Sequence, residues 1–334
     1  MGLFSEIYTD FSRDTIWMRE RILKDLNSIP PFLQPLLDHF VRRRLTLLPN
    51  NDRSIQLDPK IGRPVPYSTF WFAKAFSLTN VPVTRRLALG MLYSAISTTI
   101  RDDLLDQKPS LQLQHSALAN IFLHKYLEGF TDLFDSDSRF WYYYAIADKE
   151  IALYEIWNLT SHYENSLDSF SEAFLRESSR YFSAVAMPTL VAVAIISDNE
   201  RQIPTISNFL KHFSMGWRIF DDFIDWRKDL TVRDLNHSSI LYSVKQNFDE
   251  RSNLDEAAVL SMFLSDDFVK KMYDAILGFF KEAREDIMPL NCDYLIRFID
   301  EQLNFHKLKR DALLQANSDF YNKLGKIVDQ TRVK

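Results

Sequence analysis

The chain has 334 residues with 40 basic and 45 acidic side chains, and its formal charge of −5 excludes the strongly basic balance of a nucleic-acid binder. Hydrophobic residues make up 46% of the sequence, which is enough for a deep core and excludes a disordered chain. Only 7 glycines and 1 cysteine occur, so a glycine-rich phosphate loop and a cysteine-ligated zinc site are excluded as well.

The pattern of apolar residues predicts an all-α protein. Apolar residues recur at helical spacing, and period-two alternation is nearly absent. Most of the prolines fall between Pro30 and Pro66, which leaves long uninterrupted segments after them. In chain order, we expect helices over residues 3–26, 30–46, 67–78, 82–106, 111–130, 138–164, 168–196, 203–228, 236–247, 255–288 and 291–328.

These helices are expected to form one domain over residues 1–334, since no repeat, low-complexity tract or flexible linker divides them. The longest nearly apolar stretch, 184–196, contains Pro188 and is well short of the ~20 residues that span a bilayer, so no transmembrane helix is expected. The start of the chain does not read as a targeting segment. With the single cysteine, Cys292, this predicts a cytoplasmic protein.

The pattern Asp-Asp-x-x-Asp occurs twice, each time after a long apolar helical segment. The two copies are Asp102, Asp103 and Asp106, and Asp221, Asp222 and Asp225, with Asp229 one turn further on. Residues four apart stack on one helix face, so each copy forms an acidic stripe. Two such charges ~4 Å apart repel by about 4 kcal/mol in a partly shielded cleft, so facing stripes need a cation. Oxygen ligands favour Mg²⁺, which commonly also binds substrate phosphate, and a diphosphate substrate follows.

Both motifs resemble those of the class I isoprenoid synthase superfamily, most closely the trans-isoprenyl diphosphate synthases and the terpene cyclases built on their fold. The resemblance implies a helical bundle with a deep central cavity, where the two motifs face each other. It also implies three Mg²⁺ ions that bind the diphosphate of an allylic prenyl substrate. The implied metal ligands and catalytic groups are Asp102, Asp103, Asp106, Asp221, Asp222 and Asp225, with Asp229 as an outlying ligand.

Basic residues extend the resemblance over most of the chain. The segment 59–64 is similar to the family's Gly-Lys-x-x-Arg-Pro segment, which implies that Lys60 and Arg63 face a diphosphate. Arg180 stands near the place of the family's phosphate-binding lysine. Arg218 occupies a position where elongating enzymes carry glutamine, and it either contacts substrate or pairs with Asp221 or Asp222. Lys228 either reaches a phosphate or balances the acidic stripe.

Three departures from the family pattern concern the second diphosphate, that of isopentenyl diphosphate. Residues 107–113 offer only Lys108 where elongating synthases carry an Arg-Arg pair. Ala95 replaces a histidine or glutamine, and Ile61 replaces a basic residue. An unneutralised buried diphosphate is costly, so condensation is expected to be weakened or lost. We therefore predict a Mg²⁺-dependent terpene cyclase that ionises a prenyl diphosphate and releases diphosphate.

Prenyl transfer is the alternative, in either of two forms. One is chain elongation with isopentenyl diphosphate. The other is head-to-head condensation, because the segment 181–186 resembles the Tyr-x-x-x-Val-Ala stretch of squalene and phytoene synthases. A third hypothesis, a non-catalytic helical partner of an active synthase, is disfavoured by the two complete acidic motifs. Dimerisation through helices is common in such families, which leaves a homodimer open.

The pocket for the hydrocarbon chain is expected to lie one to two turns below the first motif. Ser97 and Thr98 replace bulky residues of short-chain members, which predicts a deep cavity and a C15 or C20 substrate. Other expected pocket residues are Tyr93, Tyr181, Phe213 and Trp217, because aromatic rings stabilise a carbocation. The histidines are expected to be structural. Replacing Asp102 or Asp222 by alanine is expected to abolish turnover and leave the fold intact.

Overall fold

The structure, a computed structural model, describes residues 10–33, 67–106, 112–160, 168–232, 238–247 and 255–332. These ranges form α-helices joined by short 3₁₀ helices and turns and contain no strand, which confirms the all-α prediction. The chain divides into two compact units. The first unit comprises residues 1–159, 181–210 and 286–296, and the second comprises 160–180, 211–285 and 297–334. The expectation of a single domain stays a prediction.

The first unit contains most of the N-terminal helices. They are α2 (Ser12–Leu26), the 3₁₀ helix η1 (Pro31–Leu33), α4 (Tyr67–Ala75), α5 (Val81–Asp106), α6 (Gln112–Thr131) and α7 (Phe140–Thr160). It also holds η4 (Glu200–Gln202) and η5 (Met288–Leu290). Three helices contribute more than two residues to each unit: α8 (Glu172–Ile196), α9 (Ile203–Val232) and α13 (Asp293–Arg332). Most of the predicted helix 30–46 lies outside the described residues.

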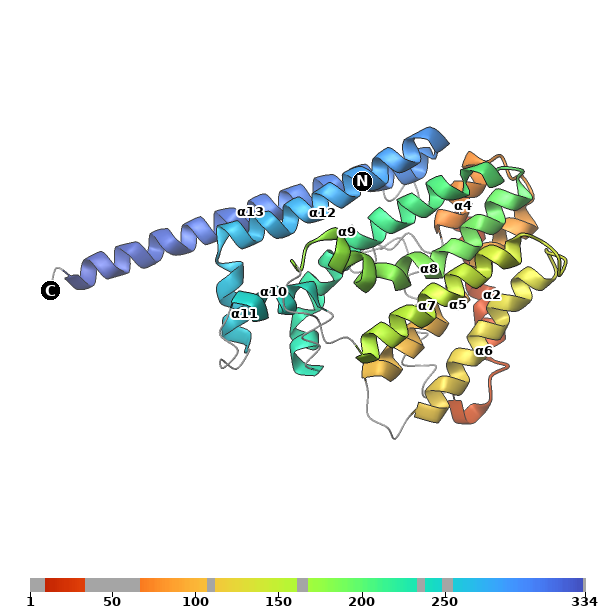
Figure 1. The fold of residues 1–334 in the computed structure, drawn as a ribbon, viewed down its shortest axis with the longest axis horizontal. Helices are drawn as coiled ribbons and strands as arrows, with labels where there is room; N and C mark the ends of the chain where they lie inside the picture. Colours follow the sequence, from red (N-terminus) through yellow and green to blue (C-terminus); the bar gives the residue numbers. More distant parts are fainter. Residues whose placement is uncertain are drawn as a thin grey trace. The chain divides into compact units, whose positions relative to one another are not determined.

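Helices α5, α6 and α7 pack side by side as an antiparallel series (Figure 1). The Ser97 hydroxyl in α5 donates to the Ala119 carbonyl in α6 at 2.8 Å. Further along the same pair, a Cβ added at Gly90 would lie 3.4 Å from Tyr126. The ring of Phe130 in α6 packs against that of Phe140 in α7, with centroids 4.6 Å apart. These contacts fix the register of α5, the helix that ends in the first acidic motif.

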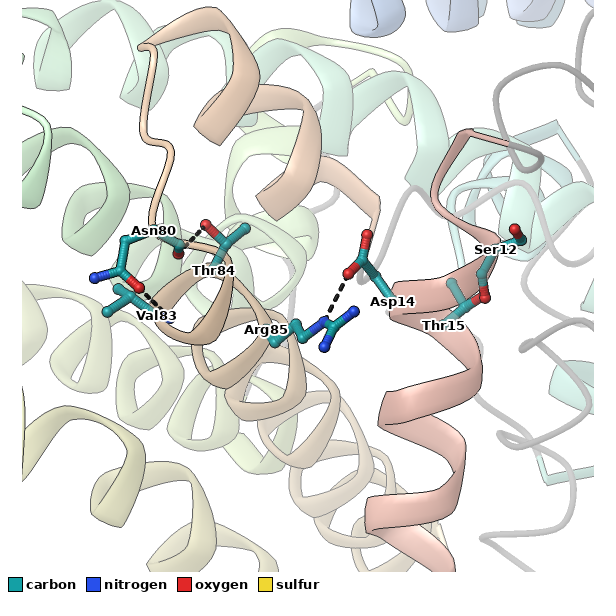
Figure 2. Close-up of polar contacts among 7 residues, drawn as sticks. All are labelled: Ser12, Asp14, Thr15, Asn80, Val83, Thr84 and Arg85. Carbon is teal, nitrogen blue, oxygen red and sulfur yellow. Dashed lines mark hydrogen bonds and ion pairs between the residues drawn. The ribbon is translucent and has the colours of Figure 1, made fainter.

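The N-terminal end of α5 is held by its own cap and by α2 (Figure 2). The Asn80 side chain accepts a hydrogen bond from the Val83 amide at 3.2 Å, and such a cap is typically worth about 1 kcal/mol. The Asn80 carbonyl accepts from the Thr84 hydroxyl at 3.1 Å. Arg85 pairs with Asp14 of α2 at 2.6 Å, so α2 and α5 are joined by a half-buried ion pair.

Helix α8 is apolar along most of its length. Its length and composition would allow it to cross a membrane, although the sequence predicts no such helix. In the structure, 61% of its most apolar window is buried within the protein, as expected of a core helix. The apolar run Leu190–Ala194 is fully buried and encloses no charged residue. Burial against protein thus accounts for its composition.

The second unit is built around the antiparallel pair of α12 (Asp266–Ile287) and α13, which run side by side in Figure 1. Ion pairs join Asp274 to Arg310 at 3.1 Å and Arg284 to Asp300 at 2.5 Å. The reversal between the two helices uses Asn291, whose φ of 50° is left-handed. Asparagine adopts this conformation more readily than most residues, which suits a chain so poor in glycine. The unit also contains α10 (Ser239–Asn247) and α11 (Glu256–Phe263).

The prediction of one helix over 255–288 is wrong, because the structure forms α11 and α12 there with a break between them. The Ser265 hydroxyl accepts from the Phe268 amide at 3.4 Å and so caps α12. Asn317 of α13 donates to the Phe263 carbonyl at 2.9 Å, and Tyr321 donates to the Leu264 carbonyl at 3.1 Å. Side chains distant in sequence therefore satisfy the end of α11, a stabilisation that helical periodicity does not reveal.

Helices α9 and α12 approach each other closely at Gly216. A Cβ added there would lie 3.3 Å from Phe279 Cβ and 3.4 Å from the Ile276 carbonyl oxygen. Any larger side chain would have to push the α12 backbone away. The glycine thus sets the spacing of the two helices five residues before the second acidic motif.

Candidate functional site

The first acidic motif occupies the C-terminal end of α5. The helix continues to Asp106, so Asp102 and Asp106 lie four residues apart on one helical face. The side chains of Asp102, Asp103 and Asp106 lie outside the described part of the structure, and their assignment as metal ligands stays a prediction. Lys60 and Arg63, expected to face a diphosphate, also lie outside the described residues.

Arg101, directly before the first aspartate, makes a bidentate contact with Glu155 of α7. Its Nε lies 2.8 Å from Glu155 Oε1, and its Nη2 lies 2.8 Å from Oε2. The two side chains are 32% and 21% exposed, so water screens the pair only partly. Sequence reasoning missed this pair because Glu155 lies on another helix. Its one signal in the sequence is a basic residue directly before the acidic motif.

Ser97 and Thr98 line a cavity of about 20 Å³ with residues of α6, α7 and α8. That volume holds about one water molecule, whereas ligand pockets measure roughly 300–1,000 Å³. The rings of Tyr126 and Tyr144 occupy the space next to it, and burial is the main cause that raises the pKa of Tyr144 to about 12. Within the described residues of the first unit, Ser97 and Thr98 thus line a small cavity. The deep cavity expected beside them stays a prediction.

Tyr181 also faces neighbours within the first unit. Its ring centroid lies 5.1 Å from that of Tyr154, and both rings belong to a buried apolar cluster with Val185. Ala95 packs against this cluster together with Ile151. The position where related synthases are expected to carry histidine or glutamine thus holds a partly buried alanine that packs against an aromatic and aliphatic cluster.

Tyr93 lies at a different cavity from the other predicted pocket residues of α5. This cavity measures about 230 Å³ and is lined by residues of α2, α5 and α6. The Tyr93 hydroxyl donates to Asp25, whose carboxylate also lies 3.4 Å from Arg21 and 3.6 Å from Lys125. Burial first, and the bond to Asp25 second, raise the pKa of the Tyr93 phenol. The structure therefore separates Tyr93 from Ser97 and Thr98.

The second acidic motif lies within α9, which continues beyond it to Val232. Asp222 is buried, with 3% of its surface exposed. Its Oδ1 lies 3.0 Å from Arg218 Nε, and its Oδ2 accepts from the Ser239 amide at 2.7 Å and the Ser239 hydroxyl at 2.6 Å. Burial raises the pKa of Asp222 to about 7, although Arg218 and Ser239 act to lower it. The carboxylate is thus occupied by groups of the chain itself.

Asp221, Asp225 and Asp229 are partly exposed on the same helix and lie at four-residue intervals. Their spacing places the three carboxylates along one helical face, a donor set that suits Mg²⁺ because this ion typically takes one or two carboxylates. Among the side chains that the structure describes, no three acidic, histidine or cysteine groups converge on one point as a metal site. The assignment of the described acids of α9 as Mg²⁺ ligands therefore stays a prediction.

Two of the basic residues predicted at the diphosphate are held by acids within the second unit. Arg218, one turn before Asp222, pairs with it, which confirms the pairing that the sequence left as one of two alternatives. Arg180 makes a bidentate contact with Glu177, with nitrogen-to-oxygen distances of 2.7 and 2.6 Å. Lys228 is exposed on α9. A role of any of these groups in diphosphate binding stays a prediction.

Phe213 and Trp217 pack in the interior of the second unit. Their rings stack with centroids 6.1 Å apart, and Phe213 also contacts Phe280 at 5.5 Å and Phe298 at 6.1 Å. Both residues are buried, with 7% and 2% of their surfaces exposed. The structure therefore gives these two rings a clear packing role between α9, α12 and α13. Whether they also line a substrate pocket stays a prediction.

Solved structures of two isoprenoid chain synthases share the fold. A decaprenyl diphosphate synthase from Rhodobacter capsulatus matches with a TM-score of 0.66 and 15% identity, over 90% of this chain and 98% of that one. A heptaprenyl diphosphate synthase from Staphylococcus aureus matches with a TM-score of 0.62 and 14% identity, over 90% and 97% of the two chains. No family model matches the sequence, and no curated protein is significantly similar to it. The chain has the all-α class I isoprenoid synthase fold, as the acidic motifs predict.

Proposed function

We propose that this protein is a Mg²⁺-dependent enzyme that ionises an allylic prenyl diphosphate and transfers the prenyl group. The observation that carries the proposal is the presence of both acidic motifs, on α5 and α9, in a fold shared with two prenyl diphosphate synthases. Bound Mg²⁺, three ions by the family resemblance, would supply electrostatic stabilisation of the departing diphosphate.

The acids have separate tasks in this proposal. Asp221, Asp225 and Asp229 bind metal from α9, because they are partly exposed and lie on one face. Asp102, Asp103 and Asp106 bind metal from α5. Asp222 orients the motif through its contacts with Arg218 and Ser239.

The basic residues assist at the diphosphate. Lys60, Arg63, Arg180 and Lys228 are proposed to neutralise phosphate charge, since a diphosphate out of water is costly without cations. Arg218 is assigned to holding Asp222, since its side chain is only 11% exposed and its Nε lies 3.0 Å from that carboxylate. The proposal thus assigns direct phosphate contact to the first four groups.

Cyclisation is the second candidate, and the surroundings of Ala95 favour it. This position offers no polar side chain to a second diphosphate and packs, like Ile151, against the cluster of Tyr154, Tyr181 and Val185. The missing basic residues at Ile61 and over 107–113 act in the same direction. The two named structural relatives, in contrast, are prenyl diphosphate synthases, and this likeness favours transfer. Transfer therefore leads, and cyclisation is tested beside it.

The deciding experiment incubates the purified protein with Mg²⁺ and the C10, C15 or C20 allylic diphosphate, each with and without isopentenyl diphosphate. A longer prenyl diphosphate, formed only when isopentenyl diphosphate is present, supports elongation. Cyclic hydrocarbons without it support cyclisation, and a head-to-head product from the allylic substrate alone supports the third type of reaction. An absence of turnover with all substrates contradicts the proposal and favours a non-catalytic partner.

The same assay decides the chain length. The expectation of a C15 or C20 substrate rests on the small side chains of Ser97 and Thr98, and the cavity of about 20 Å³ beside them is far too small for such a chain. Turnover of the C10 substrate alone would exclude the longer substrates.

A homodimer is proposed on the basis of an exposed apolar stripe on α7. Tyr142, Ile146, Leu153 and Ile156 are 65%, 42%, 37% and 56% exposed, and their spacing places them on one helical face. Contiguous exposed apolar residues mark interaction surfaces. If this stripe forms the contact, analytical ultracentrifugation of the Ile146→Glu variant should give the mass of a monomer, whereas wild type gives the mass of a dimer.

The cytoplasmic location stays a prediction from the sequence.

A further inference from the structure

The C-terminal end of α5 combines two unfavourable electrostatic features. The last turns of this helix carry Asp102, Asp103 and Asp106, and no basic residue lies in its last turn. Carboxylates at a helix C-terminus face the negative end of the helix dipole, which is unfavourable. Asp102 and Asp106 also repel each other at four-residue spacing. Without support, this end of the helix is expected to fray.

Arg101 provides a contact from this end of the helix to a neighbouring helix. Its guanidinium bonds both carboxylate oxygens of Glu155 at 2.8 Å. Residues one and two positions apart do not face each other on a helix, so Arg101 is poorly placed to neutralise Asp102 or Asp103. It reaches instead to α7, where the planar bidentate geometry orders both partners.

We propose that Glu155, through Arg101, is a positioning residue that keeps the acidic end of α5 helical and so prepares the first motif for Mg²⁺. The proposal rests on the proposed function only for the identity of the metal. Carboxylates on a frayed turn bind metal only in the fraction of molecules in which the turn is formed. The apparent metal affinity falls by that fraction.

The chain offers a matched control at the opposite end of the same helix. Arg85 pairs with Asp14 at 2.6 Å, and these side chains are 26% and 20% exposed, close to the values for Arg101 and Glu155. Glu155→Gln and Asp14→Asn therefore each remove one half-buried ion pair while nearly preserving side-chain shape. Only Glu155→Gln removes it beside the acidic motif.

The first measurement is amide hydrogen exchange in the metal-free full-length protein. For Glu155→Gln, we expect exchange over residues 102–106 to accelerate about 3- to 10-fold, as loss of a half-buried charged contact permits. Asp14→Asn should leave these amides unchanged. Arg101→Gln should match Glu155→Gln, and the double variant should add little, because the two residues act as one unit. Unchanged exchange in Glu155→Gln overturns the proposal whatever the enzyme activity.

The second measurement is Mn²⁺ binding followed by electron paramagnetic resonance, together with the Mg²⁺ dependence of turnover. Glu155→Gln should raise the metal concentration at half-saturation about 3- to 10-fold, with a maximal rate within about twofold of wild type at saturating metal. A reduced maximal rate with unchanged metal dependence would contradict a positioning role. The two proposals can fail separately. If wild type binds Mn²⁺ but turns over no prenyl diphosphate, and Glu155→Gln still accelerates exchange over residues 102–106, the proposed function fails and the role of Glu155 stands.

Discussion

The two Asp-Asp-x-x-Asp motifs have the same spacing but occupy different local environments. The first copy lies at the end of α5, where the helix dipole opposes its charges. The second lies within α9, and its middle acid, Asp222, is buried with Arg218 and Ser239 as partners. Two copies of the same sequence motif therefore need not have the same role. The position along the helix and the neighbours of each carboxylate decide what it can bind.

The largest expected effect is the loss of folding stability when Asp222 of the second motif is replaced by alanine. Asp222→Ala leaves the guanidinium of Arg218, only 11% exposed, without this carboxylate, and breaking such a buried pair typically costs about 3–5 kcal/mol. Urea unfolding at pH 8 measures the loss of stability. A double variant, Arg218→Met with Asp222→Leu, should lose less than Asp222→Ala, because it removes both charges. This outcome would revise the expectation from the sequence that Asp222→Ala leaves the fold intact.

Next in size is the effect on turnover of a partly exposed acid of the same motif. Asp221→Asn should lower kcat about 10²- to 10³-fold, the range seen when one electrostatic group of an active site is removed. The unfolding free energy should change far less than in Asp222→Ala, because the Asp221 side chain is partly exposed. Normal turnover in this variant would contradict the assignment of Asp221 to the metal.

The pH dependence of folding stability tests whether His306, in the core next to the second motif, is buried as a neutral ring. His306 is fully buried, and its ring centroid lies 4.4 Å from that of Phe220, the residue before Asp221. Burial lowers the pKa of His306 to about 3. Below pH 6.5 the unfolded chain therefore binds a proton that the folded chain does not. Stability contributed by the neutral ring is complete above pH 6.5 and is lost as the pH falls toward 3.

The His306→Phe variant should lack this decrease of folding stability at low pH, because phenylalanine binds no proton. Between pH 8 and pH 5, wild type should lose about 2 kcal/mol more stability than the variant, measured by urea unfolding at each pH. The raised pKa of Asp222 acts in the opposite direction between about pH 4 and 7, because protonation then occurs first in the folded chain. Comparing the two proteins at each pH cancels that contribution. Parallel pH profiles would show that His306 is not buried as a neutral ring.

The smallest expected effect is a gain of folding stability when an acid of the first motif is neutralised, opposite in sign to the loss expected for Asp222→Ala. Asp106→Asn removes a negative charge from the last turn of α5, so it should stabilise the metal-free protein by about 0.3–1 kcal/mol. Thermal unfolding at low ionic strength provides the measurement. A loss of stability would show that Asp106 is held by a partner, as Asp222 is, and the contrast between the motifs would disappear.

Sequence patterns predicted most of the helices but only part of the site. Long apolar periods and sparse prolines marked α5, α8 and α9 within a few residues, because burial of one face dominates such helices. The break after Phe263 was missed, since Asn317 and Tyr321 satisfy it from another helix. The contact of Asp222 with Ser239 was missed for the same reason, whereas its pairing with Arg218 follows from local spacing.

The close approach at Gly216 limits which sequences can keep this arrangement. A methyl group would already be crowded by Phe279 and the Ile276 carbonyl, and backbone yields less readily than a flexible side chain. Among variants generated at random and sorted for retention of structure, this position should therefore admit alanine with difficulty and nothing bulkier. Variants that differ widely elsewhere in sequence would still carry glycine at this position, five residues before the second acidic motif.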